Sequence, residues 1–145
     1  MKEQIVEVSK RLKDLHRRFL ERERQQAEKY FERRISPFDF LQMLTHEQSF
    51  KWLQPFSALI AEIDAFADES EEVTQADLDC IREQIDFVLH KENPQAAIYH
   101  RYQHHLSEDP EFVLLHSSLR QALIKLDSGK KKLERGQLNG SGQTL

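Results

Sequence analysis

Apolar residues in the first thirty positions recur at the spacing of one helix face. Ile5, Val8, Leu12, Leu15 and Phe19 are separated by alternating steps of three and four residues, which places their side chains along one stripe of an α-helix. A stripe of this kind is stable only when other elements cover it. The spacing therefore predicts a long N-terminal helix, over residues 2–34, that packs into a helical bundle.

The composition agrees with helix and argues against strands. Only four glycines and four prolines occur in 145 residues, and valine and threonine, which strands favour, number five and three. A chain of this length fits one domain with a single core. We therefore predict an all-α bundle of five or six helices over residues 1–128, followed by a mobile polar tail over residues 129–145.

Capping residues followed by proline mark where later helices begin. Ser36-Pro37, Asn93-Pro94 and Asp109-Pro110 each combine a good N-cap with a residue suited to the first turn. Thr74 with Asp77 has the spacing of a capping box. Ser128-Gly129 is expected to end the last helix.

Two stretches near the end of the first helix are harder to place. Residues 21–29 have Ala27 as their only apolar member, so we expect this stretch to protrude into solvent or to meet a partner through charge. After Pro37, the apolar residues Phe38, Leu41 and Leu44 are spaced to face inward. A second capping box is predicted at residues 45–48.

An aromatic block surrounds Pro55. Phe50, Trp52 and Phe56 lie close to this proline, which either kinks a helix or occupies its first turn. Such aromatics usually form core, but a kink can also open a groove that accepts a ligand or a partner helix. Together with His46, these residues are candidates for either role.

Seven histidines raise the question of a metal site. His100 and His104 stand four apart, so both could bind one ion from the same helix face. The other helices offer no Glu-x-x-His pair of the kind that completes metal centres in bundles. His46 and His116 have apolar neighbours, so we expect them to be largely buried and hydrogen-bonded.

No catalytic site is expected. Cys80 stands beside Asp77 and Asp79, whose negative charge would raise the thiol pKa rather than activate the thiol. A phosphate-binding glycine loop is also missing, because the first glycine is Gly129. We predict no cofactor.

Charge is unevenly distributed along the chain. Residues 1–34 hold 11 basic and 7 acidic side chains, whereas residues 62–92 hold 2 basic and 11 acidic ones; residues 125–145 are again basic, with 5 and 2. The first helix could neutralise the acidic segment within the molecule, or the acidic face could attract a basic partner. The candidate docking residues are Glu69, Glu71, Glu72, Asp79 and Glu83.

Several classes of protein are disfavoured by the sequence. No apolar run approaches the roughly 18 residues of a membrane span, and the N-terminal segment lacks the pattern of a secretory signal. A net charge of −4 disfavours a nucleic-acid partner. One cysteine excludes an internal disulfide, so a cytoplasmic location is expected.

One block carries a resemblance. Ser36-Pro37, Phe40-Leu41-Gln42, His46, Phe50-Lys51-Trp52-Leu53, Pro55, Ser57-Ala58-Leu59-Ile60 and Ile63-Asp64 together resemble a small family of uncharacterised helical bacterial proteins. The resemblance implies a bacterial helical domain in which the block from His46 to Asp64 matters, and it implies no activity.

The sequence favours a non-enzymatic, cytoplasmic protein–protein interaction or regulatory module, with a second copy of the chain as one candidate partner. The alternatives are a metal-binding bundle that uses His100 and His104, and a small-ligand carrier with a pocket near Trp52.

Overall fold

The chain folds into helices joined by short connections. A computed structural model describes residues 1–90 and 96–140, with side chains described for residues 1–90 and 97–126. Within these residues there is no strand, so the predicted all-α class is confirmed. The elements in chain order are α1 Lys2–Phe31, α2 Pro37–His46, the 3₁₀ helix η1 Gln48–Leu53, α3 Gln54–Glu69, α4 Gln75–Ile85, the π-helical turn η2 Asp86–His90, α5 Ala96–Glu108 and α6 Pro110–Gly140.

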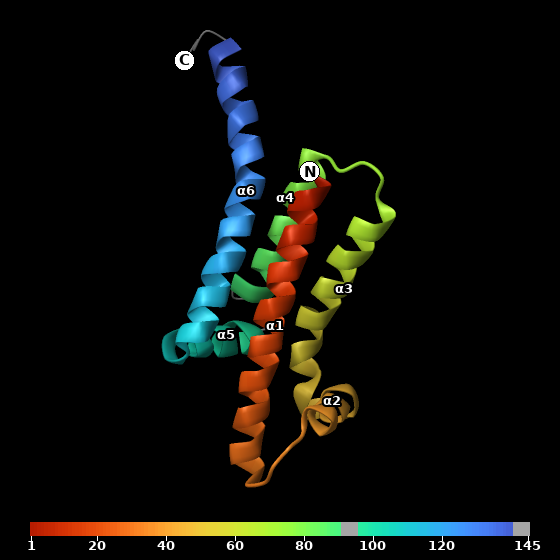
Figure 1. The fold of residues 1–145 in the computed structure, drawn as a ribbon, viewed down its shortest axis with the longest axis vertical. Coiled ribbons are helices and arrows are strands. Elements are labelled where there is room, and N and C mark those ends of the chain that lie inside the picture. The colour runs from red at the N-terminus through yellow and green to blue at the C-terminus, as the bar shows by residue number, and fades with distance from the viewer. Residues whose placement is uncertain (91–95, 141–145) are drawn as a thin grey trace.

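Helix α1 is the centre of the bundle. Helix α3 lies along one side of it, α6 along the other and α4 behind it, while α5 crosses the lower part of α6 (Figure 1). The short α2 lies beside the lower end of α3, near the C-terminal end of α1. None of the described helices combines the length and apolar character needed to cross a bilayer.

The predicted stripe of α1 forms the centre of the core. Ile5, Val8, Leu12, Leu15 and Phe19 have no exposed surface. They are covered by apolar residues from the surrounding helices, among them Phe56, Leu59 and Ile63 of α3, Leu78, Ile81 and Ile85 of α4, Ile98 and Tyr102 of α5, and Phe112, Leu119 and Leu123 of α6. The spacing of three and four residues therefore predicts the buried face of α1 correctly.

The predicted helix starts that fall within the described residues are confirmed. The Ser36 hydroxyl accepts a hydrogen bond from the Asp39 N–H at 3.0 Å. The Thr74 hydroxyl accepts from the Asp77 N–H, and the Asp77 carboxylate accepts from the Thr74 N–H in return, which completes the capping box. The Asn93-Pro94 start lies outside the described residues.

Several boundaries differ from the prediction. Helix α1 ends at Phe31 rather than Arg34, because Glu32 adopts the left-handed conformation that terminates helices. The expected capping box at 45–48 does not form, since the Thr45 hydroxyl donates back to the Leu41 carbonyl. Pro55 lies in the first turn of α3 and causes no kink.

The expected stop at Ser128-Gly129 is also wrong, because α6 continues to Gly140. A single glycine inside a helix costs only about 1 kcal/mol relative to alanine, and the lysines that follow are good helix formers. The predicted mobile tail, residues 129–145, lies outside the part of the chain whose side chains the structure describes.

Helix α2 presents a different face from the one expected. Phe40 and Met43 are buried in a small cluster with Ala27 and Ile35, whereas Phe38 and Leu41 are 68% and 55% exposed and Leu44 is half-buried. A spacing of three residues fits the face with Phe38 and Leu41 as well as the face with Phe40 and Met43. The second face is buried because it packs against Ile35.

Candidate functional site

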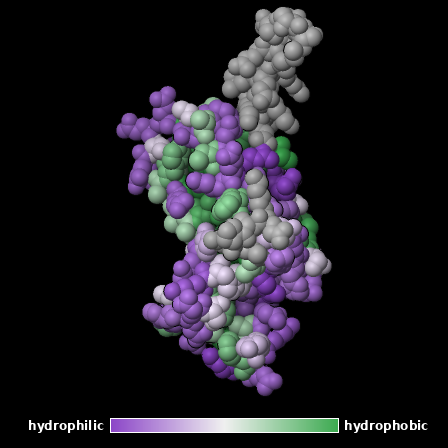
Figure 2. Space-filling model, turned by 180° about the vertical axis from the view of Figure 1, so that it is seen from behind, coloured by the Kyte–Doolittle hydropathy of each residue, from purple (hydrophilic) through white to green (hydrophobic). Residues whose placement is uncertain are grey.

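An apolar surface recess lies between α3 and α4. We call it the α3–α4 groove; its volume is about 540 Å³. Its lining residues are Pro55, Ala58, Leu59 and Glu62 of α3, Cys80, Glu83 and Gln84 of α4, and Phe87 and Val88 of η2. On the face shown in Figure 2, hydrophobic residues lie in a hollow bordered by hydrophilic ones.

The groove follows from the helix period on both of its walls. Along α3 the lining positions recur at steps of three and four residues, as they do from Cys80 to Phe87 on the other wall. The π-helical turn η2 follows α4, and Phe87 within this turn is 52% exposed. The groove is therefore an unfilled space between two adjacent helices.

Two carboxylates border the groove. Glu62 and Glu83 are both exposed, and in the part of the chain that the structure describes neither makes an ion pair. The nearby cation Arg82 lies 3.8 Å from the Asp86 carboxylate, measured from Nε to Oδ2. The apolar floor is thus flanked by negative charge.

Cys80 places a free thiol in the same groove. It is exposed and forms no disulfide, and its Sγ lies 3.8 Å from the Gln84 amide nitrogen. It is the only cysteine in the sequence. The thiol is therefore a unique chemical handle on this surface.

Of the five predicted docking residues, only Glu83 lies in the groove. Glu69 ends α3, and Glu71 and Glu72 are exposed in the connection that follows. Asp79 on α4 accepts a hydrogen bond from the Gln75 amide at 3.1 Å. Glu62, on the facing wall of the groove, was not among the predicted docking residues.

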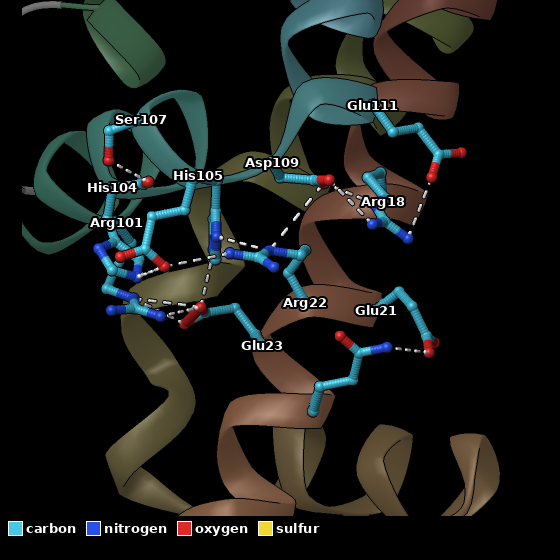
Figure 3. Close-up of polar contacts among 12 residues, drawn as sticks. Arg18, Glu21, Arg22, Glu23, Arg101, His104, His105, Ser107, Asp109 and Glu111 are labelled. Carbon is cyan, nitrogen blue, oxygen red and sulfur yellow. Dashed lines mark hydrogen bonds and ion pairs between the residues drawn. The ribbon is translucent and has the colours of Figure 1, made fainter.

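Helix α1 neutralises little of the acidic segment. Lys13 pairs with Asp64 at 2.7 Å, which is the ion pair that α1 makes to residues 62–90 among the described side chains. Arg18 and Arg22, in the lower half of α1, instead turn toward the end of α5 and the start of α6 (Figure 3). The intramolecular explanation of the charge pattern therefore accounts for Asp64 but leaves Glu62 and Glu83 unpaired.

A buried polar network joins α1 to α5. Glu23 is 6% exposed and His105 is 1% exposed. The Glu23 carboxylate accepts two bonds from Arg101, at 2.7 and 3.1 Å, and one from Nε2 of His105 at 2.9 Å. Nδ1 of His105 accepts from Nε of Arg22 at 3.3 Å, so the ring carries its proton on Nε2.

The same network continues to the start of α6. Asp109 is 6% exposed and accepts a bidentate pair from Arg18 at 2.7 and 3.0 Å. The bond from Arg18 is the main reason why the pKa of Asp109 lies below its usual value. Among the described residues, no buried side-chain nitrogen or oxygen atom of this network lacks a hydrogen-bond partner, so the network fixes α5 and α6 on α1 (Figure 3).

This network corrects the expectation for residues 21–29. The stretch does not protrude, because Glu23 and Ala27 are buried. A charge pattern alone could not reveal a buried glutamate, since its two partners, Arg101 and His105, stand about 80 positions later in the sequence. The one available signal was the four-residue spacing of Phe19, Glu23 and Ala27, which continues the buried stripe.

The histidines singled out in the sequence lie in different environments in the structure. His100 is exposed, and Nε2 of His104 lies 3.3 Å from the Glu108 carboxylate. Among the described residues no group of three or more histidine, cysteine or acidic side chains could hold a metal ion. His46 is exposed rather than buried, because it ends α2 on the outer side.

His116 is half-buried and belongs to a second polar cluster. Its Nδ1 lies 2.6 Å from the Tyr102 hydroxyl, and burial lowers the pKa of His116 to about 4. His90 contacts both rings, and its Nδ1 lies 3.1 Å from Asp86. Within the described residues, His90 Nε2 is buried and has no hydrogen-bond partner.

His16 is a half-buried histidine that the sequence pattern did not identify. Its Nε2 lies 3.1 Å from the Ser57 hydroxyl, and its ring contacts Phe56 edge-on with centroids 4.7 Å apart. Burial lowers the pKa of His16 to about 4. Its position between Leu15 and Phe19 placed it beside the buried stripe.

The aromatic block belongs mainly to the core. Phe56 is fully buried, and Trp52 is half-buried with its ring edge-on to Phe19 at 6.4 Å. Phe50 stacks edge-on against Phe40 and borders a smaller groove of about 290 Å³ that also includes His16 and Leu53. The block therefore connects α2 to the main core.

Comparisons with known proteins found no matching family model, no similar curated protein and no similar solved structure.

Proposed function

We propose that this chain is a non-enzymatic cytoplasmic interaction module, and that its α3–α4 groove binds an amphipathic helix with a basic flank. The observation that carries the proposal is an apolar floor set between two exposed, unpaired carboxylates. Glu62 on α3 and Glu83 on α4 stand on opposite walls, so a helix lying between them would meet both.

The dimensions of the groove suit a short helix. From Pro55 to Glu62 the α3 wall covers about two turns, or roughly 11 Å. A partner helix in such a groove inserts apolar side chains at spacings of three and four residues. Lysine or arginine beside that ridge would face Glu62 and Glu83, and the attraction would weaken as salt increases.

Binding of designed peptides tests the proposal. A fluorescent helical peptide with a leucine ridge and flanking lysines is titrated with the protein, and anisotropy is measured at low and at moderate salt. We expect saturable binding that weakens with salt. A peptide with glutamate in place of lysine, and one with the same lysines but a scrambled ridge, should bind at least about tenfold more weakly.

A matched pair of charge reversals locates the contact. The double variant Glu62→Lys/Glu83→Lys should bind the basic peptide at least about tenfold more weakly than the wild type. Glu71→Lys/Glu72→Lys changes the net charge equally but in the connection after α3, and it should bind almost normally. Equal losses in both variants would show that only net charge matters, and the groove assignment would be wrong.

A further inference from the structure

We infer that a second copy of this chain supplies the helix, so that α2 of one copy docks into the α3–α4 groove of another. This inference rests on the proposed function of the groove and names its occupant. The argument comes from the exposed side of α2 and from the charges beside it.

Helix α2 presents an unused apolar ridge. Phe38 and Leu41 are 68% and 55% exposed, and Thr45 continues the same face one turn later. These positions are spaced i, i+3 and i+7, which is the anchor pattern of a helix that lies in a groove. Phe40 and Met43 meanwhile hold the opposite face of α2 to its own chain.

Basic side chains stand at the end of α1 and in the connection that leads to α2. Lys29, Arg33 and Arg34 are exposed, and none of the three forms an ion pair within the described part of the chain. Arg33 instead lies over the Phe31 ring, with its guanidinium carbon 5.8 Å from the ring centroid. Residues 29–34 carry a net charge of +2, the sign that the groove requires.

The two surfaces are complementary in size and in charge. The ten residues of α2 span about 15 Å, enough to cover the wall from Pro55 to Glu62. Among the described side chains, the groove offers an apolar floor and two carboxylates without ion pairs, Glu62 and Glu83. The surface that we call the corner consists of the exposed ridge of α2 and the cations Lys29, Arg33 and Arg34 that precede this helix, and it offers the opposite charge. Both surfaces are on one chain, so every copy carries both halves of the contact.

Sedimentation of the whole protein over about a hundredfold range of concentration tests the inference. We expect the average mass of the wild type to rise above that of a monomer. A corner variant, Arg33→Glu/Arg34→Glu, and a groove variant, Glu62→Lys/Glu83→Lys, should each remain monomeric. A control variant, Val113→Ser/Leu114→Ser, removes exposed apolar residues of α6 and should associate like the wild type.

Mixing the variants gives the sharpest result. The quadruple variant Arg33→Glu/Arg34→Glu/Glu62→Lys/Glu83→Lys reverses both surfaces in one chain and should associate again. The groove variant and the corner variant should each stay monomeric alone, but an equimolar mixture of the two should form mixed complexes, because the basic groove of one then meets the acidic corner of the other. Restored association in the quadruple variant supports docking of α2 into the groove. Its absence, with wild-type association intact, would overturn the assignment of these surfaces.

The outcomes also separate this inference from the proposed function. A wild type that stays monomeric but binds the basic peptide in its groove would overturn self-docking and leave the proposed function standing. The wild-type protein is also sedimented with anionic lipid vesicles. If it stays monomeric but binds the vesicles, and the corner variant does not, a membrane surface is the partner of the corner and self-docking is overturned. Loss of peptide binding equally in groove and loop variants would remove the basis of both.

Discussion

The carboxylate of Glu23 is the charged group on which most of the polar packing around α5 depends. Burial by itself would raise the pKa of Glu23, but the bonds from His105 and Arg101 hold it below its usual value. Removal of one member of a buried, paired network leaves the others without partners. A single conservative change at this position should therefore have a large effect.

We expect Glu23→Gln to lower the free energy of unfolding by about 3 kcal/mol, because Arg101 then lacks its anionic partner inside the protein. Glu21→Gln is the matched control on the same helix: Glu21 pairs with Arg24 at the surface, so its loss should cost under about 1 kcal/mol. Urea unfolding measures both values. Equal losses would show that the Glu23 network contributes no more than a surface pair.

The lowered pKa values of His16 and His116 predict a particular pH dependence. Both values are about 4 in the folded chain, below the ordinary 6.5 of the unfolded chain. Between these two pKa values the unfolded chain therefore binds more protons than the folded chain. The free energy of unfolding falls as the pH is lowered from about 6.5 to 4, and the full contribution of each histidine is present above about pH 6.5.

Replacement of either histidine should flatten that dependence. We expect wild-type protein to lose about 1–2 kcal/mol per histidine between pH 7 and pH 5, and His16→Gln and His116→Gln each to lose correspondingly less over the same interval. Denaturant unfolding at both pH values gives the slopes. Identical slopes in wild type and variants would mean that these rings are protonated as easily in the folded chain as in the unfolded one.

At the scale of the elements, the helices that could be predicted were those whose local signals agree with their packing. The stripe from Ile5 to Phe19 and the caps at Ser36 and Thr74 depend on residues close in sequence. The face of α2 was predicted wrongly because its orientation depends on Ile35, a residue outside the helix, and on the half-buried Phe50.

The candidate site was less predictable than the fold for the same reason. A groove forms between residues about 25 positions apart, and no local pattern reports which helix faces will meet. Glu83 was predicted from charge alone. Glu62 and Cys80 could be identified as groove residues only from the way α3 packs against α4. Exposed Phe38 and Leu41 were expected in the core because their spacing does not distinguish an inner ridge from an outer one.

The aromatic block provides a prediction at this scale. Trp52→Ala should lower stability by about 2–4 kcal/mol, because the indole covers Phe19 and supports the junction of η1 and α3. Phe38→Ala removes another aromatic ring nearby, but one that is mostly exposed, and it should change stability by under about 0.5 kcal/mol. Thermal or urea unfolding of both variants decides; similar values would place Trp52 outside the core.

At the scale of the whole molecule, the ion pairs between described side chains include neither the groove carboxylates Glu62 and Glu83 nor the cations Lys29, Arg33 and Arg34. The arginines of α1 hold α5 and α6 in place, and Lys13 pairs with Asp64, but the carboxylates of the groove and the cations at the end of α1 stay exposed. The account therefore assigns the network to stability and the α3–α4 groove to binding.

Cys80 allows that assignment to be tested directly. Because it is the only cysteine and lines the groove, its rate of reaction with a neutral maleimide at fixed pH reports access to this surface alone. The rate is measured with and without saturating basic amphipathic peptide, and also with a peptide of equal charge that lacks the apolar ridge. The account predicts that the amphipathic peptide slows the reaction by about tenfold or more and that the control peptide does not; an unchanged rate, while anisotropy shows the amphipathic peptide bound, would contradict it.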